Sequence, residues 1–279
     1  MPLQRDSEGV VSSKEARVPR VIIDGREVIV EEEQTILDAA KKAGVWIPTL
    51  CFNPAISVPA ACRICMVELV RKGRESQLVT ACNYPVRGDT VVNVSSERAV
   101  RVQRGVMELL LARSPDSIEL KTLAARMGVN GTPYPKVTES QRNCILCGLC
   151  TRVCEEVIGA SAISFVGRGV DRAVAPPFRL ASEDCIACGA CAVVCPVGTI
   201  QVRIHTESGE AEISPFKSRV KLLMCEECGK RMVTVPVASQ LVDKVHINWD
   251  EFKKRAKLCP DCRRKLTARA MSLGVYRRM

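Results

Sequence analysis

The pattern of hydrophobic and polar positions predicts a small sheet and one helix near the N-terminus. Asp24-Gly25, a pair typical of tight hairpin turns, separates the first two of five strand-like runs, at 21–23, 28–30, 65–70, 78–82 and 91–94. Thr35 can cap a helix over residues 36–40, and Gly44 is suited to its C-terminal end. We therefore expect a β-β-α-β-β unit, with the run 91–94 as an added last strand, in which a small sheet packs on the helix.

The hydrophobic period then changes. Apolar residues recur at helical spacing over 98–127 and predict two helices, with Pro115 suited to the start of the second. Residues 128–135 are a turn-rich linker, and another linker is expected near Ser208-Gly209 and Pro215. The chain ends in a basic stretch with a helical pattern.

The sixteen cysteines fall into four sets of four, and this spacing is the main chemical signal. The sets are Cys51, Cys62, Cys65 and Cys82; Cys144, Cys147, Cys150 and Cys154; Cys185, Cys188, Cys191 and Cys195; and Cys225, Cys228, Cys259 and Cys262. Proteins hold iron–sulfur clusters and tetrahedral zinc with thiolates in fours at short spacing. A chain with this pattern is predicted to carry electrons.

Two of the runs, 144–154 and 185–195, each read C-x2-C-x2-C-x3-C. In proteins with two such runs, the fourth cysteine of each run ligates the other cluster. We therefore predict one 4Fe–4S cluster on Cys144, Cys147, Cys150 and Cys195, and a second on Cys154, Cys185, Cys188 and Cys191. Pro196 follows Cys195 as the motif expects, whereas Glu155 follows Cys154.

The fourth set consists of two pairs, Cys225-x2-Cys228 and Cys259-x2-Cys262. Such pairs suit a closed tetrahedral site, which is most often zinc. A rubredoxin-like mononuclear iron is the redox-active alternative. A zinc ribbon can also bind nucleic acid, but no set of aromatic residues for base stacking accompanies this one.

A disulfide framework is the other use of many cysteines, and it is typical of small secreted domains. This chain has 279 residues and opens without an apolar signal-peptide core, so we expect reduced thiols and a cytoplasmic location. The uncharged run 185–202 approaches the length of a membrane span. It contains four cysteines, Gly189 and Pro196, which suit cluster loops, and we expect no transmembrane span.

The formal charge of +10 counts every cysteine as neutral. A metal centre held by four thiolates carries about −2, so four such sites offset about eight of these positive charges. The basic excess therefore compensates for the cofactors, and we expect no nucleic-acid partner.

The first set reads C-x10-C-x2-C-x16-C, a layout related to plant-type 2Fe–2S ferredoxins but with a longer first gap. Its surroundings resemble one family: the large iron–sulfur subunit of respiratory complex I, the diaphorase iron–sulfur subunit of NAD-linked nickel–iron hydrogenases, and the electron-input end of iron-only hydrogenases. The residues that carry the resemblance are Ile36-Leu37-Asp38-Ala39-Ala40, Ile47-Pro48-Thr49-Leu50-Cys51 and Ala61-Cys62-Arg63-Ile64-Cys65-Met66-Val67-Glu68. The resemblance continues along the chain through Cys144–Cys195.

The resemblance implies that Cys51, Cys62, Cys65 and Cys82 hold a 2Fe–2S cluster in a β-grasp ferredoxin fold. The family usually continues with one histidine and three cysteines that hold a further 4Fe–4S cluster. The sequence has no histidine or cysteine between Asn83 and Asn143, so that cluster is excluded. The two predicted helices would remain as a packing bridge.

These features predict an α+β chain of several parts: a disordered arm (1–19), a 2Fe–2S ferredoxin-like domain (20–97), a helical bridge and linker (98–140), a bacterial-type domain with two 4Fe–4S clusters (141–207) and a zinc-ribbon-like domain (220–279). The expected cofactors are one 2Fe–2S cluster, two 4Fe–4S clusters and one zinc ion.

The expected function is a non-catalytic electron-transfer subunit of a multi-subunit NAD(P)-linked oxidoreductase. The sequence has no dinucleotide-binding fingerprint and no site for a reacting substrate. The resemblance implies a flavin-containing, NAD(P)H-oxidising subunit as one partner. The other would be a hydrogenase, in an assembly that could bifurcate electrons, or a formate dehydrogenase, and a soluble ferredoxin is a further candidate. Two alternatives stay open: a redox-sensing zinc-ribbon interaction protein and a free-standing polyferredoxin.

Overall fold

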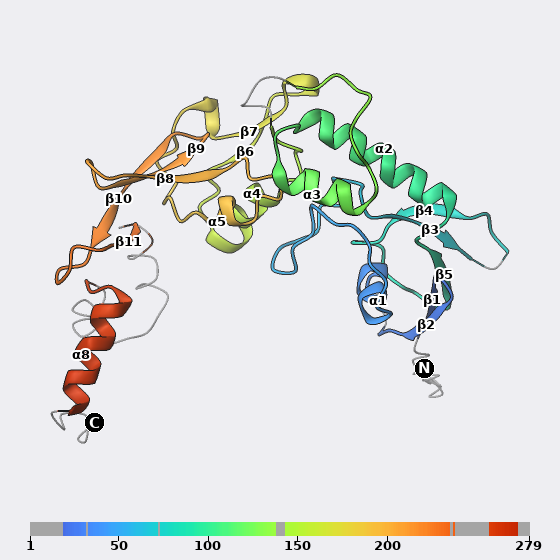
Figure 1. The fold of residues 1–279 in the computed structure, drawn as a ribbon, viewed down its shortest axis with the longest axis horizontal. Coiled ribbons are helices and arrows are strands. Elements are labelled where there is room, and N and C mark those ends of the chain that lie inside the picture. The colour runs from blue at the N-terminus through green and yellow to red at the C-terminus, as the bar shows by residue number, and fades with distance from the viewer. Residues whose placement is uncertain are drawn as a thin grey trace, which may run out of the picture. The chain divides into compact units, whose positions relative to one another are not determined.

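The chain forms two compact units. The structure is a computed structural model that describes residues 19–31, 33–71, 73–137, 143–234, 237 and 257–272. One unit comprises the chain up to Thr49 together with Arg63–Gly105, and the other comprises Leu50–Cys62 together with the chain from Val106 onward. The elements of each are labelled in Figure 1. The predicted disordered arm lies outside the described residues except for Pro19, which is buried.

The first unit contains a five-stranded sheet with the strand order β2-β1-β5-β3-β4. Its strands are β1 (Arg20–Ile23), β2 (Arg26–Ile29), β3 (Met66–Val70), β4 (Gln77–Thr80) and β5 (Thr90–Asn93). Strands β1 and β5 are parallel, and the other neighbouring pairs are antiparallel. The five predicted strands and the predicted hairpin are confirmed.

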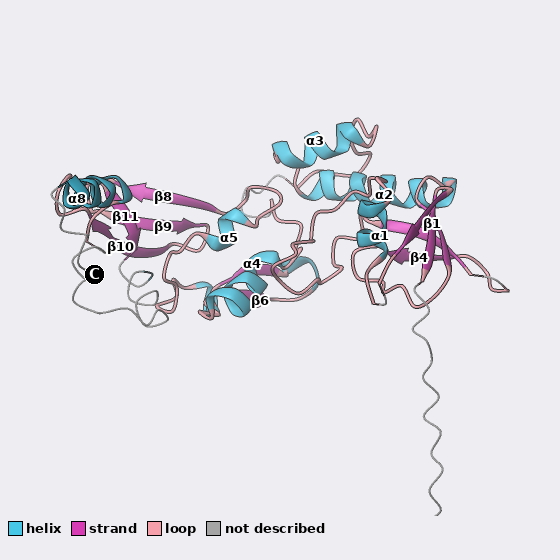
Figure 2. Cartoon of the chain, turned by 90° about the horizontal axis from the view of Figure 1, so that it is seen from below, coloured by secondary structure: helices cyan, strands magenta, loops and turns pink. Residues whose placement is uncertain are grey.

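Helix α1 (Ile36–Lys42) covers one face of this sheet by packing on β1 and β2 (Figure 2). The helix begins with a reciprocal cap: Thr35 Oγ1 accepts a hydrogen bond from the Asp38 amide, and the Asp38 carboxylate accepts one from the Thr35 amide, both at 3.2 Å. Gly44 follows the helix at φ 66°, a left-handed conformation that suits glycine. The predicted helix and its cap are thus confirmed.

The core of the first unit follows from the alternation along its strands. Val21 and Ile23 on β1, Val67 and Leu69 on β3, and Val92 on β5 are each at most 1% exposed. Successive residues of a strand point to opposite faces, so each of these strands sends every second side chain inward.

Two helices follow, α2 (Glu97–Arg113) and α3 (Ile118–Arg126). Both were predicted, but the prediction that Pro115 begins the second is wrong. Ser117 is the cap of α3, and its Oγ accepts the amide hydrogen of Leu120 at 3.2 Å. A serine hydroxyl satisfies an unpaired amide of the first turn, which Pro115, two residues earlier, cannot do.

The cysteine-rich part of the second unit is built from short elements. These are α4 (Leu149–Arg152), the π-helical turn η2 (Val153–Ile158), β6 (Ser164–Val166), the 3-10 turn η3 (Gly169–Asp171), β7 (Ala173–Ala175), the 3-10 turn η4 (Pro177–Arg179) and α5 (Ala190–Val193). Strands β6 and β7 pair antiparallel. Cys150, Cys154 and Cys191 lie on α4, η2 and α5, and the other five cysteines of the two runs lie in loops.

A four-stranded antiparallel sheet follows, in the order β11-β10-β9-β8. Its strands are β8 (Gln201–His205), β9 (Glu210–Ser214), β10 (Ser218–Met224) and β11 (Arg231–Thr234). The predicted linker near Ser208-Gly209 and Pro215 is therefore wrong, because these residues form the turns β8–β9 and β9–β10. Ala211 and Ile213 of β9 share one hydrophobic cluster with Cys150 and Ala187, so the sheet supports the cysteine loops.

Helix α8 (Pro260–Ser272) is the last described element and confirms the predicted basic helix. Within the described residues, no helix has both the length and the hydropathy that crossing a bilayer requires.

Candidate cluster and metal sites

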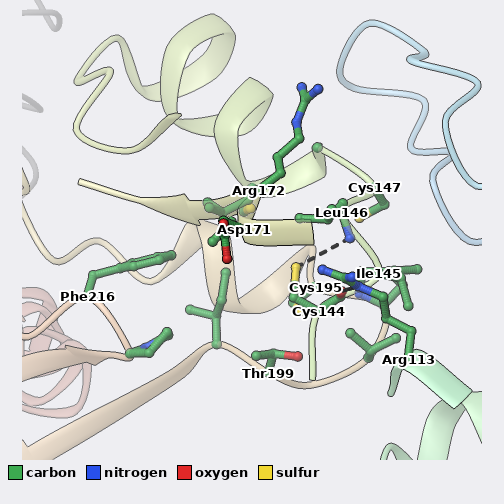
Figure 3. A pocket seen from close by; sticks show the side chains of 18 of the residues that line it. Arg113, Cys144, Ile145, Leu146, Cys147, Asp171, Arg172, Cys195, Thr199 and Phe216 are labelled. Carbon is green, nitrogen blue, oxygen red and sulfur yellow. Dashed lines mark hydrogen bonds between the residues drawn. The ribbon is translucent and has the colours of Figure 1, made fainter. Parts of the chain in front are cut away.

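Four cysteines from distant parts of the second unit line one cavity of about 170 Å³ (Figure 3). They are Cys144, Cys147, Cys150 and Cys195, the set predicted for one 4Fe–4S cluster. Arg113 at the end of α2 also lines this cavity, and its Nε donates to the Cys144 carbonyl oxygen at 2.9 Å. Four soft sulfur donors that converge on one cavity fit a 4Fe–4S cluster.

The backbone of both cysteine runs turns in the same unusual way. Leu146 and Ala187, each just before the second cysteine of its run, have φ of 54° and 49°, and Gly148 and Gly189 have φ of 79° and 77°. A Cβ on Gly148 would lie 3.4 Å from Phe165 Cζ, which is an ordinary contact, so glycine is favoured there by its left-handed conformation and not by lack of space. The turn also lets the Leu146 amide donate to Cys144 Sγ at 3.4 Å, drawn as a dashed line in Figure 3.

Burial and neighbouring sulfurs control the protonation of these thiols. Burial, together with the smaller effect of the nearby thiolates of Cys144 and Cys195, raises the pKa of Cys147 to about 12. Burial also raises the pKa of Cys144 and Cys150. The thiols therefore hold their protons at neutral pH until a metal displaces them. Cys51, in the loop over residues 50–62, also raises the pKa of Cys147, which places its sulfur near this cavity.

The other predicted 4Fe–4S set, Cys154, Cys185, Cys188 and Cys191, lines a second, mainly apolar cavity. Burial raises the pKa of Cys154, and it raises that of Cys191 to about 12. Cys188 differs from the others because its residue is exposed. The two cavities group the eight sulfurs as the predicted ligand sets do, and the ligation itself stays a prediction.

The 2Fe–2S set is divided between the two units. Cys51 and Cys62 lie in the loop 50–62 of the second unit, where the Cys62 amide donates to Cys51 Sγ at 3.4 Å. Cys65 and Cys82 lie in the first unit, one just before β3 and the other just after β4. All four are buried. Their common cluster stays a prediction, which the family comparison below supports.

The fourth set does come together in the described structure. The sulfurs of Cys225, Cys228, Cys259 and Cys262 all lie within 4.8 Å of one another. Those of Cys228 and Cys259 are 3.7 Å apart. A regular tetrahedron with metal–sulfur bonds of about 2.3 Å has edges of about 3.8 Å, so the set fits one tetrahedral ion such as zinc.

Backbone amides favour the thiolate form of two of these four cysteines, Cys225 and Cys259, whereas neighbouring sulfurs raise the pKa of Cys262 to about 12. The Cys259 amide donates to Cys225 Sγ at 3.3 Å and lowers the pKa of Cys225 to about 6. The Cys262 amide likewise donates to Cys259 Sγ at 3.5 Å and lowers the pKa of Cys259. Thiolates are the form that binds metal, so these sulfurs are prepared for an ion.

The sequence reasoning missed the residues that support the cysteines. Arg113, beside Cys144, lies at the end of a predicted helix and carries no motif. Thr234 of β11 donates through its hydroxyl to the Ile186 carbonyl, between Cys185 and Cys188, at 2.6 Å. Both contacts join segments far apart in the chain, and a spacing pattern holds no signal for them.

Comparison with known families assigns two domains. The model of the 2Fe-2S iron-sulfur cluster binding domain matches residues 17–97, and the model of the 4Fe-4S dicluster domain matches residues 143–199. The first range includes all four cysteines of the 2Fe–2S set, and the second includes the eight that line the two cavities.

Several relatives share this part of the chain. NADPH-Fe(3+) oxidoreductase subunit alpha of Geobacter sulfurreducens is 34% identical in an alignment of 169 residues that covers 53% of this chain and 20% of that protein. NADP-reducing hydrogenase subunit HndD of Solidesulfovibrio fructosivorans is 36% identical in an alignment of 187 residues that covers 57% of this chain and 32% of that protein. The mitochondrial NADH-ubiquinone oxidoreductase 78 kDa subunit of Candida albicans is 30% identical in an alignment of 187 residues that covers 58% of this chain and 26% of that protein.

The crystal structure of an NAD+-reducing NiFe-hydrogenase in the H2-reduced state matches with a TM-score of 0.49 and 27% identity, over 57% of this chain and 74% of that one. This chain spans only 20% to 32% of the length of the three curated relatives. The resemblance noted in the sequence is nevertheless confirmed over the two cluster domains. The chain is thus an iron–sulfur protein with a 2Fe–2S domain and a 4Fe–4S dicluster domain, homologous to the 78 kDa subunit of NADH-ubiquinone oxidoreductase and to subunits of NADP-reducing hydrogenases.

Proposed function

We propose that this chain is the electron-transfer subunit of an NAD(P)-linked oxidoreductase complex. It would receive electrons from a flavin-containing subunit that oxidises NAD(P)H and pass them to a catalytic partner. The bound clusters would supply one-electron transfer. The role of the chain's own residues is to hold three groups of cysteines close together in an apolar setting.

The main support is that cysteines of both predicted 4Fe–4S sets belong to one hydrophobic cluster of the second unit, the unit that also contains the loop of Cys51 and Cys62. The thiolate of Cys191, from the second cavity, raises the pKa of Cys150 in the first, and Cys51 does the same to Cys147. Charges influence one another in this way only over short distances. The nearness of Cys51 to Cys147, and of Cys191 to Cys150, supports a relay through the predicted clusters.

The identity of the partners is drawn from the relatives. One of them is named a subunit of an NADP-reducing hydrogenase and another a subunit of an NADPH-linked iron oxidoreductase. We therefore favour a hydrogenase as the catalytic partner, in a complex that could bifurcate electrons, with formate dehydrogenase as the next candidate. The fourth cysteine set would hold zinc, which is redox-silent and stabilises the C-terminal region.

Anaerobic analysis of iron, sulfide and zinc in the purified chain, with low-temperature EPR of the reduced sample, tests this proposal. One 2Fe–2S cluster, two 4Fe–4S clusters and one zinc ion require about ten iron, about ten sulfide and about one zinc. About eleven iron without zinc would instead make the fourth set an iron site. Markedly less iron in a fully loaded sample would contradict the proposal.

A single substitution tests the ligand map. We expect Cys188→Ala to remove the EPR signal of one 4Fe–4S cluster and to leave the 2Fe–2S signal, because Cys188 lines only the second cavity. Cys228→Ala is the matched control, since it removes a cysteine of the fourth set and should leave all three cluster signals. Retention of all three signals in Cys188→Ala would show that the map is wrong.

A further inference from the structure

The loop between Cys51 and Cys62 is longer than the corresponding loop of plant-type ferredoxins, with ten intervening residues against about four. This loop has a defined fold. Asn53 Oδ1 accepts the amide hydrogen of Ala55 at 2.9 Å, which forms a tight local turn, and Ile56 is 8% exposed. The turn brings Ser57 to the middle of the loop, six residues after Cys51 and five before Cys62.

Ser57 is bound at this point to the segment that carries Cys154. Its amide donates to Glu156 Oε2 at 2.8 Å, and its hydroxyl donates to Glu156 Oε1. Arg152 Nη1 donates to the Ser57 hydroxyl oxygen and also lies 3.3 Å from Glu156 Oε1. We call Ser57, Arg152 and Glu156 the Ser57 clasp.

The clasp joins two groups of predicted ligands. On one side, Ser57 lies on the loop that begins at Cys51 and ends at Cys62. On the other, Arg152 ends α4, which carries Cys150, and Glu156 lies in η2, which carries Cys154. Each of the three residues of the clasp is therefore within a few residues of a cysteine.

The chemistry of the clasp explains why it can hold the loop. All three side chains are accessible to water, and an isolated exposed ion pair contributes little. Here one carboxylate accepts hydrogen bonds from both the backbone and the side chain of one serine, and charge-assisted bonds of this kind are about twice as strong as neutral ones. Because it accepts from the backbone, the carboxylate fixes the chain itself as well as the side chain.

We propose that the Ser57 clasp is a positioning device that fixes the loop of Cys51 and Cys62 to the segment of Cys150 and Cys154 within the second unit, and so positions two of the predicted 2Fe–2S ligands relative to the predicted 4Fe–4S ligands. The inference rests on the proposed function in one respect, that these cysteines hold those clusters. The residues of the Ser57 clasp are not predicted cluster ligands, so they act on the positions of the cysteines that are.

Hydrogen exchange of the full-length protein tests the contact without reference to any cluster. Glu156→Ala removes the acceptor of the Ser57 amide, and we expect amide exchange in the peptide 50–62 to become about tenfold faster. Glu155→Ala is the matched control, since Glu155 is the exposed neighbour of the same charge. Unchanged exchange in Glu156→Ala would overturn the proposal even if all clusters are present.

EPR of the reduced protein tests the consequence. Two paramagnetic clusters broaden each other's signals by a dipolar interaction that weakens as they move apart. In Ser57→Ala, with iron and sulfide content unchanged, we expect a loss of this broadening in the 2Fe–2S signal and slower electron transfer to the neighbouring cluster. Ser57→Thr keeps the hydroxyl and the amide and should restore both.

A broadening that stays the same in Ser57→Ala and Glu156→Ala would overturn the proposal, because a purely stabilising contact would leave the spectrum unchanged. Absence of the clusters themselves would instead contradict the proposed function, and the exchange measurement would still decide the clasp. The two failures are therefore distinguishable.

Discussion

At the scale of single residues, Arg113 has the clearest influence on a predicted cluster. Its guanidinium lines the first cavity, donates to the Cys144 carbonyl and lowers the pKa of the Cys144 thiol, which burial otherwise raises. Reduction adds a negative charge to a cluster, and a nearby cation stabilises the more negative state. Arg113 should therefore raise the reduction potential of the cluster in this cavity.

Replacing Arg113 with Gln tests this influence, because glutamine keeps a donor for the Cys144 carbonyl and removes only the charge. We expect the equilibrium to favour the oxidised cluster about tenfold more, which for one electron corresponds to a potential lower by about 59 mV. An EPR-monitored redox titration measures the shift. Lys121→Gln, on the exposed side of α3, is the control, and equal potentials in the two variants would contradict the expectation.

The ligand cysteines and their supporting residues differ in how far the sequence predicts them. Ligand cysteines are recognisable because short loops must bring their sulfurs to one metal centre, which imposes a fixed spacing. Arg113 contacts Cys144 from 31 residues away along the chain, and Glu156 contacts Ser57, on the loop of Cys51 and Cys62, from 99 residues away. A contact across such a separation depends on how the chain folds, and no local pattern encodes it.

At the scale of elements, α1 owes its start to the cap formed by Thr35 and Asp38. Thr35→Ala removes the side chain that accepts the Asp38 amide and should destabilise the first unit by about 1 kcal/mol. Hydrogen exchange of the α1 amides measures this loss locally, which suits a chain with two units better than a global unfolding curve. Thr35→Ser keeps the hydroxyl and should behave like the natural protein, and similar losses in both variants would exclude the cap as the cause.

The C-terminal sheet shows where element prediction fails. Ser208-Gly209 and Pro215 are typical of both linkers and hairpin turns, and composition alone does not distinguish the two. The signal that does so is the alternation on either side, with Val202 and Ile204 on β8 and Ala211 and Ile213 on β9. In β8 the apolar residues Val202 and Ile204 are themselves exposed, at 43% and 53%. The alternation in this strand therefore does not separate a buried face from an exposed one.

At the scale of the whole molecule, binding of zinc to the fourth set should be linked to pH in a specific way. The pKa of Cys225 is lowered to about 6, so near pH 7.5 this sulfur is already a thiolate and has no proton to release. We expect zinc binding to release fewer than four protons near pH 7.5, and the number to rise toward four as the pH falls below about 6. Calorimetry in buffers of different ionisation enthalpy counts these protons, and release of four near pH 7.5 would contradict the lowered pKa.

The exposure of Cys188 has a consequence for how the protein survives in air. Oxidants attack sulfur ligands that they can reach, and the attack is slower where the protein covers the sulfur. Cys188 is the exposed member of the second cavity's set, whereas Cys147 and Cys150 of the first are buried. We expect oxygen to destroy the cluster at Cys188 before the cluster at the buried Cys147 and Cys150, so that the protein loses its iron in air in steps.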